Sequence, residues 1–339
     1  MKPKQLLTSL MALVVCSTFA QNTITVDNSP GANADYADLQ PAINFASAND
    51  IIYVHASETS YGEVTINKPL YIIGFGHSNP DKNTYLDGII LTNGSDGSYI
   101  SGLNINGDII TSNTIIINDL IFENNKIHDI EFGGLGANNV VIRGNVINRI
   151  SPPGSGGYNY TNTLITNNVI ASGGTSGIFL KNHESIIIRN NIFLYATKVY
   201  NQNASTGDVV VQNCIFYRSV GTGNWNNDGV VFENCLTYNP NGATTPLVGT
   251  GNWDDTNPNF VYVDDQVWNP DFDFHLQPSS IAIGAGINGE DLGIYDGMTP
   301  FLFNNFGFTA GIPTVTITAI TEQVAPGDNI EVTIQSNSN

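Results

Sequence analysis

Basic residues are scarce in this chain. Of its 339 residues, 11 are Lys or Arg and 30 are Asp or Glu, so the formal net charge is −19. Such an excess of negative charge opposes binding to nucleic acid and to anionic lipid. It also opposes binding to anionic polysaccharides unless a bound cation bridges the two. We therefore expect no nucleic-acid partner.

Cysteine is equally scarce, with three residues. None has the spacing of a metal-binding pair, and no Cys is placed with a His as a catalytic nucleophile would be. Cys16 lies in a segment typical of a secretory signal, with a basic start, an apolar run from Leu6 to Val15 and a small-residue cleavage site before Gln21. We predict a signal peptide at residues 1–20 and a secreted protein, either extracellular or at the cell surface. Lipid attachment at Cys16 is disfavoured because Val15 stands where a small residue is needed.

The apolar run of this signal is too short to span a bilayer, so the mature chain is predicted to have no transmembrane segment. Loss of residues 1–20 removes Lys2 and Lys4 but no acidic residue, which makes the mature chain more acidic still.

A short phrase recurs seven times in the middle of the chain. The copies align on one column at steps of 20 to 23 residues, and apolar residues recur three and five positions before it. The column consists of Leu103, Asn125, Asn145, Asn168, Asn191, Cys214 and Cys235. The spacing of two is that of a half-buried strand. A period this short, built from strands, predicts a solenoid in which each repeat is one coil.

Equivalent positions in a parallel solenoid stack roughly 4.7–4.9 Å apart, so like residues contact like residues. We predict that the Asn column takes the left-handed conformation of a bend and forms an amide ladder, with Gly102 and Gly144 serving the same bend. Cys214 and Cys235 share the column in consecutive coils. They are predicted to be stacked thiols, with a disulfide as the alternative that export would permit.

The ends of the solenoid carry their own signals. Asp35-Tyr-Ala-Asp38 predicts the start of a capping helix, and residues 51–54 a following strand. The phrase from Lys68 to Gly76, together with the repeats, resembles right-handed parallel β-helix proteins of the pectate-lyase-like superfamily. The segment 257–294 resembles the closing segment of secreted bacterial β-helix proteins. The resemblance covers roughly residues 23–296.

The predicted fold is therefore an all-β, right-handed parallel β-helix with a short N-terminal capping helix and a small C-terminal β segment. The expected divisions are a signal peptide (1–20), an N-terminal strand and capping helix (21–62), the parallel β-helix (63–296), a connector (297–311) and a C-terminal β segment (312–339).

The resemblance also suggests where to look for catalysis. Lyases of the superfamily use Lys or Arg as a base, often with Ca²⁺, which makes Lys181, Arg189 and Arg143 candidates. Hydrolases of the superfamily use Asp residues in adjacent coils. Glu184, Asp208 and Asp228 precede their columns by similar offsets and would repel one another if stacked. For Arg143 and Arg189, surface ion pairing is the competing interpretation.

Exposed aromatic rings are the residues on which sugars stack. Five are candidates for carbohydrate binding: Tyr195, Tyr200, Tyr217, Trp225 and Tyr238. The competing interpretation is that these rings cover the edges of the solenoid. No metal site is assigned, because the acidic clusters lack regular ligand spacing, and Ca²⁺ is left open as a ligand.

We predict a non-catalytic, carbohydrate-binding surface protein, monomeric, whose partner is a polysaccharide or cell-surface glycan. A polysaccharide lyase acting on uronic-acid-containing glycans is the first alternative, and a structural or adhesive module the second. Because the regular columns face inward, function is expected in the variable connections between coils.

Overall fold

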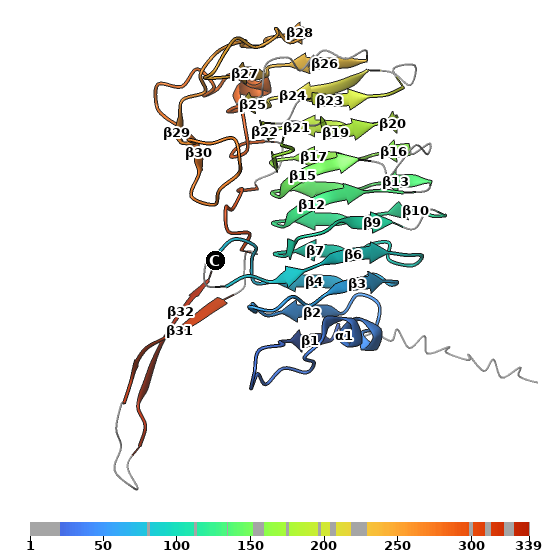
Figure 1. The fold of residues 1–339 in the computed structure, drawn as a ribbon, viewed down its shortest axis with the longest axis vertical. Coiled ribbons are helices and arrows are strands. Elements are labelled where there is room, and N and C mark those ends of the chain that lie inside the picture. The colour runs from blue at the N-terminus through green and yellow to red at the C-terminus, as the bar shows by residue number, and fades with distance from the viewer. Residues whose placement is uncertain are drawn as a thin grey trace, which may run out of the picture.

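Parallel β-strands stack coil upon coil in the computed structural model of this chain (Figure 1). The structure describes residues 21–79, 82–111, 114–133, 135–151, 159–173, 176–195, 198–203, 208–217, 229–297, 301–308, 313–321 and 329–338. The predicted signal peptide and the predicted site residues Asp228 and Trp225 lie outside these ranges. The predicted fold class, an all-β parallel solenoid with a small C-terminal β segment, is confirmed.

The solenoid has three parallel sheets, two that run along most of its length and a shorter one in its middle coils. Sheet 1 has eleven strands: β1 (Thr23–Val26), β2 (Ile51–Val54), β4 (Tyr71–Gly74), β7 (Tyr99–Ser101), β11 (Ile121–Glu123), β14 (Val141–Arg143), β17 (Leu164–Thr166), β21 (Ile187–Arg189), β24 (Val209–Gln212), β26 (Val230–Glu233) and β28 (Gly249–Thr250). Sheet 3 has four strands: β10 (Ile116–Asn118), β13 (Gly136–Asn138), β16 (Asn159–Thr161) and β20 (Asn182–Glu184).

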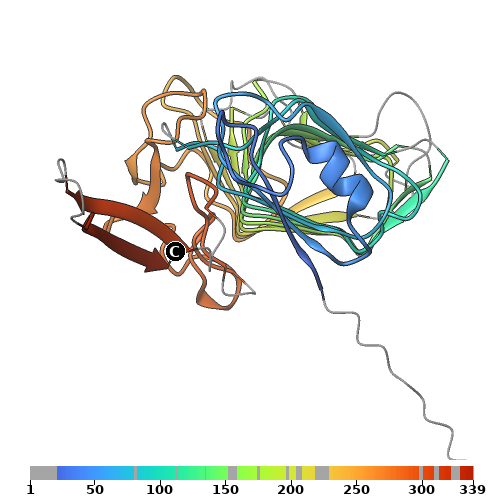
Figure 2. The same cartoon turned by 90° about the horizontal axis from the view of Figure 1, so that it is seen from below.

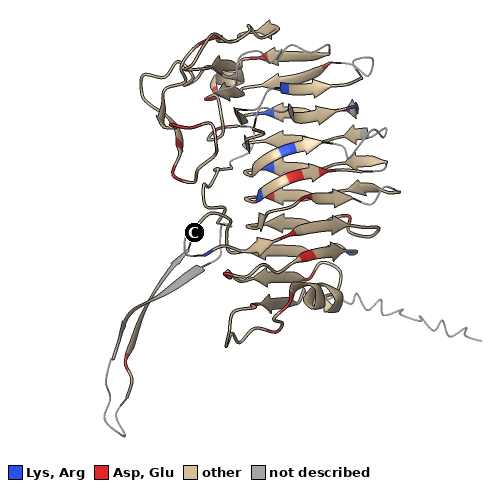
Figure 3. Cartoon of the chain, viewed as in Figure 1, with Lys and Arg blue, Asp and Glu red and all other residues tan. Residues whose placement is uncertain are grey.

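Sheet 2 faces sheet 1 across the core and has thirteen strands. They are β3 (Glu63–Ile66), β5 (Tyr85–Leu86), β6 (Gly88–Leu91), β8 (Asn104–Ile105), β9 (Ile109–Thr111), β12 (Lys126–Glu131), β15 (Val146–Ser151), β18 (Val169–Ile170), β19 (Ser176–Leu180), β22 (Ile192–Leu194), β23 (Lys198–Asn201), β25 (Ile215–Tyr217) and β27 (Leu236–Tyr238). The stacked aliphatic columns, such as Phe122, Ile142 and Ile165, are fully buried between the sheets. Charged residues are sparse on the solenoid (Figure 3).

The N-terminal end is closed by α1 (Leu39–Phe45), which lies across the first coil with Leu39, Ala42 and Ile43 buried (Figure 2). Asp38 stands at the N-cap without a side-chain capping bond. The predicted capping helix is thus present.

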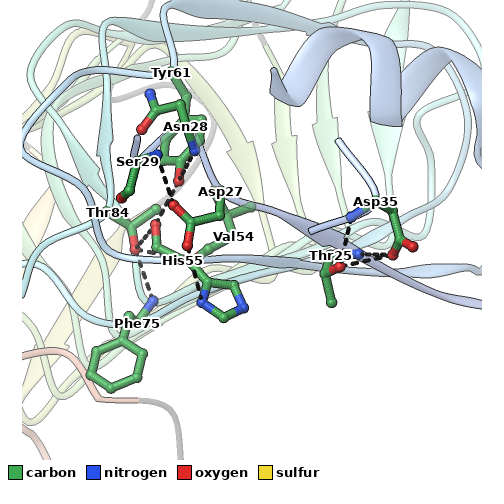
Figure 4. A network of polar contacts seen from close by, with 10 residues as sticks. All are labelled: Thr25, Asp27, Asn28, Ser29, Asp35, Val54, His55, Tyr61, Phe75 and Thr84. Carbon is green, nitrogen blue, oxygen red and sulfur yellow. Dashed lines mark hydrogen bonds and ion pairs between the residues drawn. The ribbon is translucent and has the colours of Figure 1, made fainter. Parts of the chain in front are cut away.

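Asp35 protects the outer edge of β1 rather than capping the helix. Its carboxylate accepts hydrogen bonds from the Thr25 backbone N (2.7 Å) and hydroxyl (2.8 Å), which lower the pKa of Asp35 (Figure 4). An edge strand with occupied donors is a poor template for another chain.

The predicted amide ladder is confirmed. The Nδ2 of Asn125 donates to Oδ1 of Asn145 (3.1 Å), Asn145 to Asn168 (3.1 Å) and Asn168 to Asn191 (3.0 Å), and all four are fully buried. The ladder ends on Cys214, which is a buried free cysteine, as is Cys235.

The left-handed bend, however, was predicted one residue too late. Positive φ belongs to the preceding column, with Gly102 and Gly144 as predicted but with asparagines in the other coils. Those asparagines are Asn124, Asn167, Asn190, Asn213 and Asn234, with φ of 52° to 55°. A ladder amide must point inward from its strand, so the turn falls on the residue before it. The side chain of that residue points outward.

The chain then runs back along the outside of the solenoid. The last strand in the parallel sheets is β28, whereas β29 (Phe260–Tyr262) and β30 (Asp273–Leu276) form a separate antiparallel hairpin. We call residues 280–297 and 301–308, which include the 3₁₀ turn η2 (Ile287–Gly289), the strap. Residues 257–294, which we expected to continue the solenoid, therefore lie against its side.

The outward asparagines hold the strap. Asn167 donates to the carbonyls of Ile294 (2.8 Å) and Asp296 (2.7 Å), and Asn234 donates to the carbonyl of Ala285 (2.8 Å). At Gly144 an added Cβ would lie 2.1 Å from the ring of Phe301, so the strap occupies the space of a side chain there.

The last element is a two-stranded antiparallel hairpin, β31 (Pro313–Ile320) and β32 (Val332–Ser338), which projects away from the solenoid (Figures 1 and 2). This is the predicted C-terminal β segment.

Candidate functional site

Two of the candidate catalytic bases, Arg143 and Arg189, contact the strap. Arg189 is 6% exposed, and its guanidinium lies 2.6 Å from the Glu290 carboxylate. Arg143 pairs with Glu123 (2.8 Å) and lies over the ring of Phe301 at 4.9 Å. The structure thus favours the ion-pairing interpretation of both side chains.

The remaining charged candidates lie away from the groove described below. Glu184 ends β20 and is exposed, and Asp208 is exposed just before β24. Lys181 is half-buried between β19 and β20. Asp228 lies outside the described residues, and the predicted carboxylate stack stays a prediction.

Of the aromatic candidates, Tyr217 and Tyr238 stack in one column as predicted, 5.8 Å apart. Tyr217 is 7% exposed because Phe260 covers it at 5.1 Å. Tyr200 packs on Phe179 at 4.8 Å. These three rings therefore cover the solenoid, and Tyr195 is the described candidate that lines a cavity.

That cavity is a groove of about 430 Å³ on the outer face of sheet 2. Strands β8, β12 and β15 contribute to its floor, and residues 266–268 line its other side. Its lining includes four amides, two aromatic rings and two basic side chains. They are Asn104, Asn106, Asn148, Gln266, Tyr195, Trp268, Lys126 and His128.

The groove exists because one outward column changes character. From Val146 through Val169 and Ile192 to Leu236 the column is apolar and buried in a second core under β29, β30 and the strap. In the two preceding coils the same position holds Lys126 and Asn104, which pair in register. Apolar surface must be covered and a lysine or amide need not be, so this end of the face stays open.

Trp268 connects the groove to the buried side chain of His77. Its ring lies 5.6 Å from Nζ of Lys126, a cation–π contact, and 5.9 Å from the ring of His77. Burial lowers the pKa of Lys126, and it lowers the pKa of His77 to about 3, with the Lys126 charge contributing. His77 is therefore neutral at neutral pH.

An acidic cluster lies beside the groove. Asp108, His128 and Asp129 place ligand atoms within 4.8 Å of one another. His128 Nδ1 lies 2.8 Å from Asp108, while Asp129 already accepts hydrogen bonds from Asn148 and Arg149. Burial and these neighbouring carboxylates raise the pKa of Glu131. The ligand atoms of Asp108, His128 and Asp129 thus already have protein partners, and Ca²⁺, which the sequence leaves open as a ligand, is not assigned to this cluster.

Sequence reasoning missed Asn104, Lys126 and Trp268 as groove residues. A signal for the floor was available, since an outward column that turns apolar from Val146 onward implies a cover. Nothing local marked Trp268, because its position depends on how the chain folds back.

No protein-family model matches this chain, and no curated protein matches it. Among the described residues, no helix is long and apolar enough to cross a membrane.

Proposed function

We propose that this chain is a secreted or cell-surface, non-catalytic β-solenoid that binds a glycan in the groove on sheet 2. The observation that carries the proposal is the combination of Trp268 and Tyr195 with four amides in one open groove. Aromatic faces stack on sugar rings, and amides both donate to and accept from hydroxyls. The resemblance to secreted bacterial β-helix proteins of the pectate-lyase-like superfamily agrees with this function.

The test is titration of the purified protein with a panel of neutral and uronic-acid glycans. At least one glycan is expected to bind, and Trp268→Ala is expected to weaken that binding at least tenfold, because stacked aromatics supply a large share of such interfaces. Tyr200→Ala is the matched control. Tyr200 was predicted to bind sugar but does not line the groove, so its loss should leave the affinity unchanged. Equal losses in both variants, or no binding by any glycan, would overturn the proposal.

A uronan lyase is the second candidate, and Lys126 is the observation that favours it. The side chain lies in the groove and its lowered pKa suits a general base. Incubation with uronans, with and without Ca²⁺, would then give unsaturated products that absorb in the ultraviolet, and Lys126→Met would abolish them. We expect no such product.

A further inference from the structure

Three buried polar atoms next to the groove have no hydrogen-bond partner among the described residues: Oδ1 of Asn104, Nε1 of Trp268 and Nε2 of His77. Their residues form one cluster. Asn104 Nδ2 donates to the His77 carbonyl (3.1 Å), and the His77 ring packs edge-on against Trp268. A buried polar atom without a partner destabilises the folded protein, so the cluster is suited to bind a further polar group.

The chemistry of that group follows from the cluster. The His77 carbonyl can only accept, which fixes Nδ2 of Asn104 toward it and leaves Oδ1 as an acceptor. The indole N–H of Trp268 can only donate. A binding group must therefore donate to one atom and accept from another. A hydroxyl does both, whereas a carboxylate only accepts.

Charge around the cluster points the same way. Asp108, Asp129 and Glu131 lie along the same face of sheet 2, and the charge of Arg149 is committed to Asp129. Lys126 is the lysine among the lining residues, and its ammonium is already held over the Trp268 ring. In a chain of net charge −19, these carboxylates oppose an anionic sugar at this place.

We propose, resting on the glycan-binding function above, that Asn104, Trp268 and His77 form a subsite for a hydroxyl group of an uncharged sugar, and that the glycan bound is neutral. Because the three atoms are buried, the sugar reaches them when the Trp268 indole rotates while its N–H stays part of the subsite. The segment that carries Trp268 is exposed: Val267 is 67% exposed, and the Gln266 backbone N bonds within the same segment, to Asp265.

The experiment compares matched pairs of oligosaccharides, neutral hexose hexamers and the corresponding uronate hexamers, by isothermal titration. Variants are Trp268→Phe, which keeps an aromatic ring but removes the N–H, and Asn104→Leu, which removes the acceptor. Tyr200→Ala, which lies outside the groove and packs on Phe179, is the control. Thermal melts show that each variant is folded, and quenching of Trp fluorescence that is lost in Trp268→Phe reports the movement of the indole.

We expect a neutral hexamer to bind at least tenfold more tightly than its uronate partner. Trp268→Phe is expected to weaken the neutral hexamer about tenfold, as one lost hydrogen bond would, and to leave the weak uronate binding unchanged. If Asn104→Leu fails to fold, Trp268→Phe alone decides.

Two results would overturn this subsite while leaving glycan binding intact. One is uronate binding as tight as neutral binding, and the other is full affinity in Trp268→Phe, which would mean that the three atoms hold only water. Absence of binding by every hexamer would overturn the proposed function and the subsite together.

Discussion

Two columns of asparagine lie one residue apart along this solenoid, and their side chains point in opposite directions. Asn125, Asn145, Asn168 and Asn191 point inward and bond to one another, coil to coil. Asn167, Asn190 and Asn234 point outward and bond to the strap. The same side chain thus stabilises the solenoid from one position and attaches a second layer from the next. The φ angle of the bend residue makes the difference.

The largest expected effect on stability comes from a substitution in the inward column. Asn168 donates to Ile142, Thr166 and Asn191 and accepts from Asn145, all in the core. Asn168→Ala removes the bonds made by the side-chain amide, keeps the one donated by the backbone N, and leaves buried partners unpaired, so we expect the free energy of unfolding to fall by about 3–5 kcal/mol. Chemical denaturation measures it. A loss below about 1 kcal/mol would mean that the ladder is not a principal source of stability.

Acid is expected to loosen the strap before it loosens the solenoid. His77 has a pKa of about 3 in the folded protein, and an unfolded His has one near 6.5. The stability that neutral His77 gives the folded protein is fully present above the unfolded pKa. It is lost as pH falls toward the folded pKa, and the free energy of unfolding drops by roughly 3 kcal/mol between pH 6.5 and pH 4. The His77 backbone N bonds to Phe306 of the strap (2.7 Å), so the loss should first loosen residues 301–308.

Hydrogen exchange at the two pH values tests this prediction, with His77→Phe as control. The variant should show a flatter dependence of stability on pH. Equal loss of protection in the strap and in the ladder strands would contradict a selective effect.

A smaller effect is expected at the outward column. Asn167→Gly keeps the left-handed φ but removes the bonds to Ile294 and Asp296, which should cost about 1–2 kcal/mol and raise hydrogen exchange locally in the strap. Asn139→Gly is the matched control, since Asn139 has the same φ of 55° but bonds to Asp119. Strap protection that falls equally in both variants would argue against attachment through Asn167.

The smallest expected effect on stability also concerns the inward column, at Cys214. Cys214 follows Asn191 in the ladder and offers only a thiol, with Asn191 Nδ2 3.9 Å from its sulfur. Cys214→Asn extends the ladder by one amide, and we expect a change within about 1 kcal/mol, favourable if the larger side chain fits. Thermal denaturation measures it. A loss of several kcal/mol would show that the coil at Cys214 is too tight for an amide.

The solenoid could be predicted from the sequence because its contacts repeat at a fixed period. Ile142 meets Phe122 and Ile165 by the same rule that stacks Asn145 on Asn125. The groove could not, because it depends on one long-range event. Trp268 reaches Lys126 and His77 only after the chain has reversed direction, and no periodicity relates these positions.

The surroundings of two candidate bases could not be predicted for the same reason. Arg143 and Arg189 look like solvent-facing residues of a repeat, and it is the strap, with Phe301 and Glu290, that covers them. Sequence pattern gives which face of a strand points outward. It does not give what lies over that face.

The strap also fixes the number of coils in the solenoid. It contacts successive coils at Ala285, Ile287, Asp291 and Ile294, through Asn234, Asn213, Asn190 and Asn167 in turn. Each coil advances the axis by roughly 4.8 Å. Inserting or deleting one whole coil between Asn167 and Asn234 would leave the inner ladder in register but would shift every later anchor by one step. A repeat protein that could otherwise gain or lose coils freely is in this way held to one count.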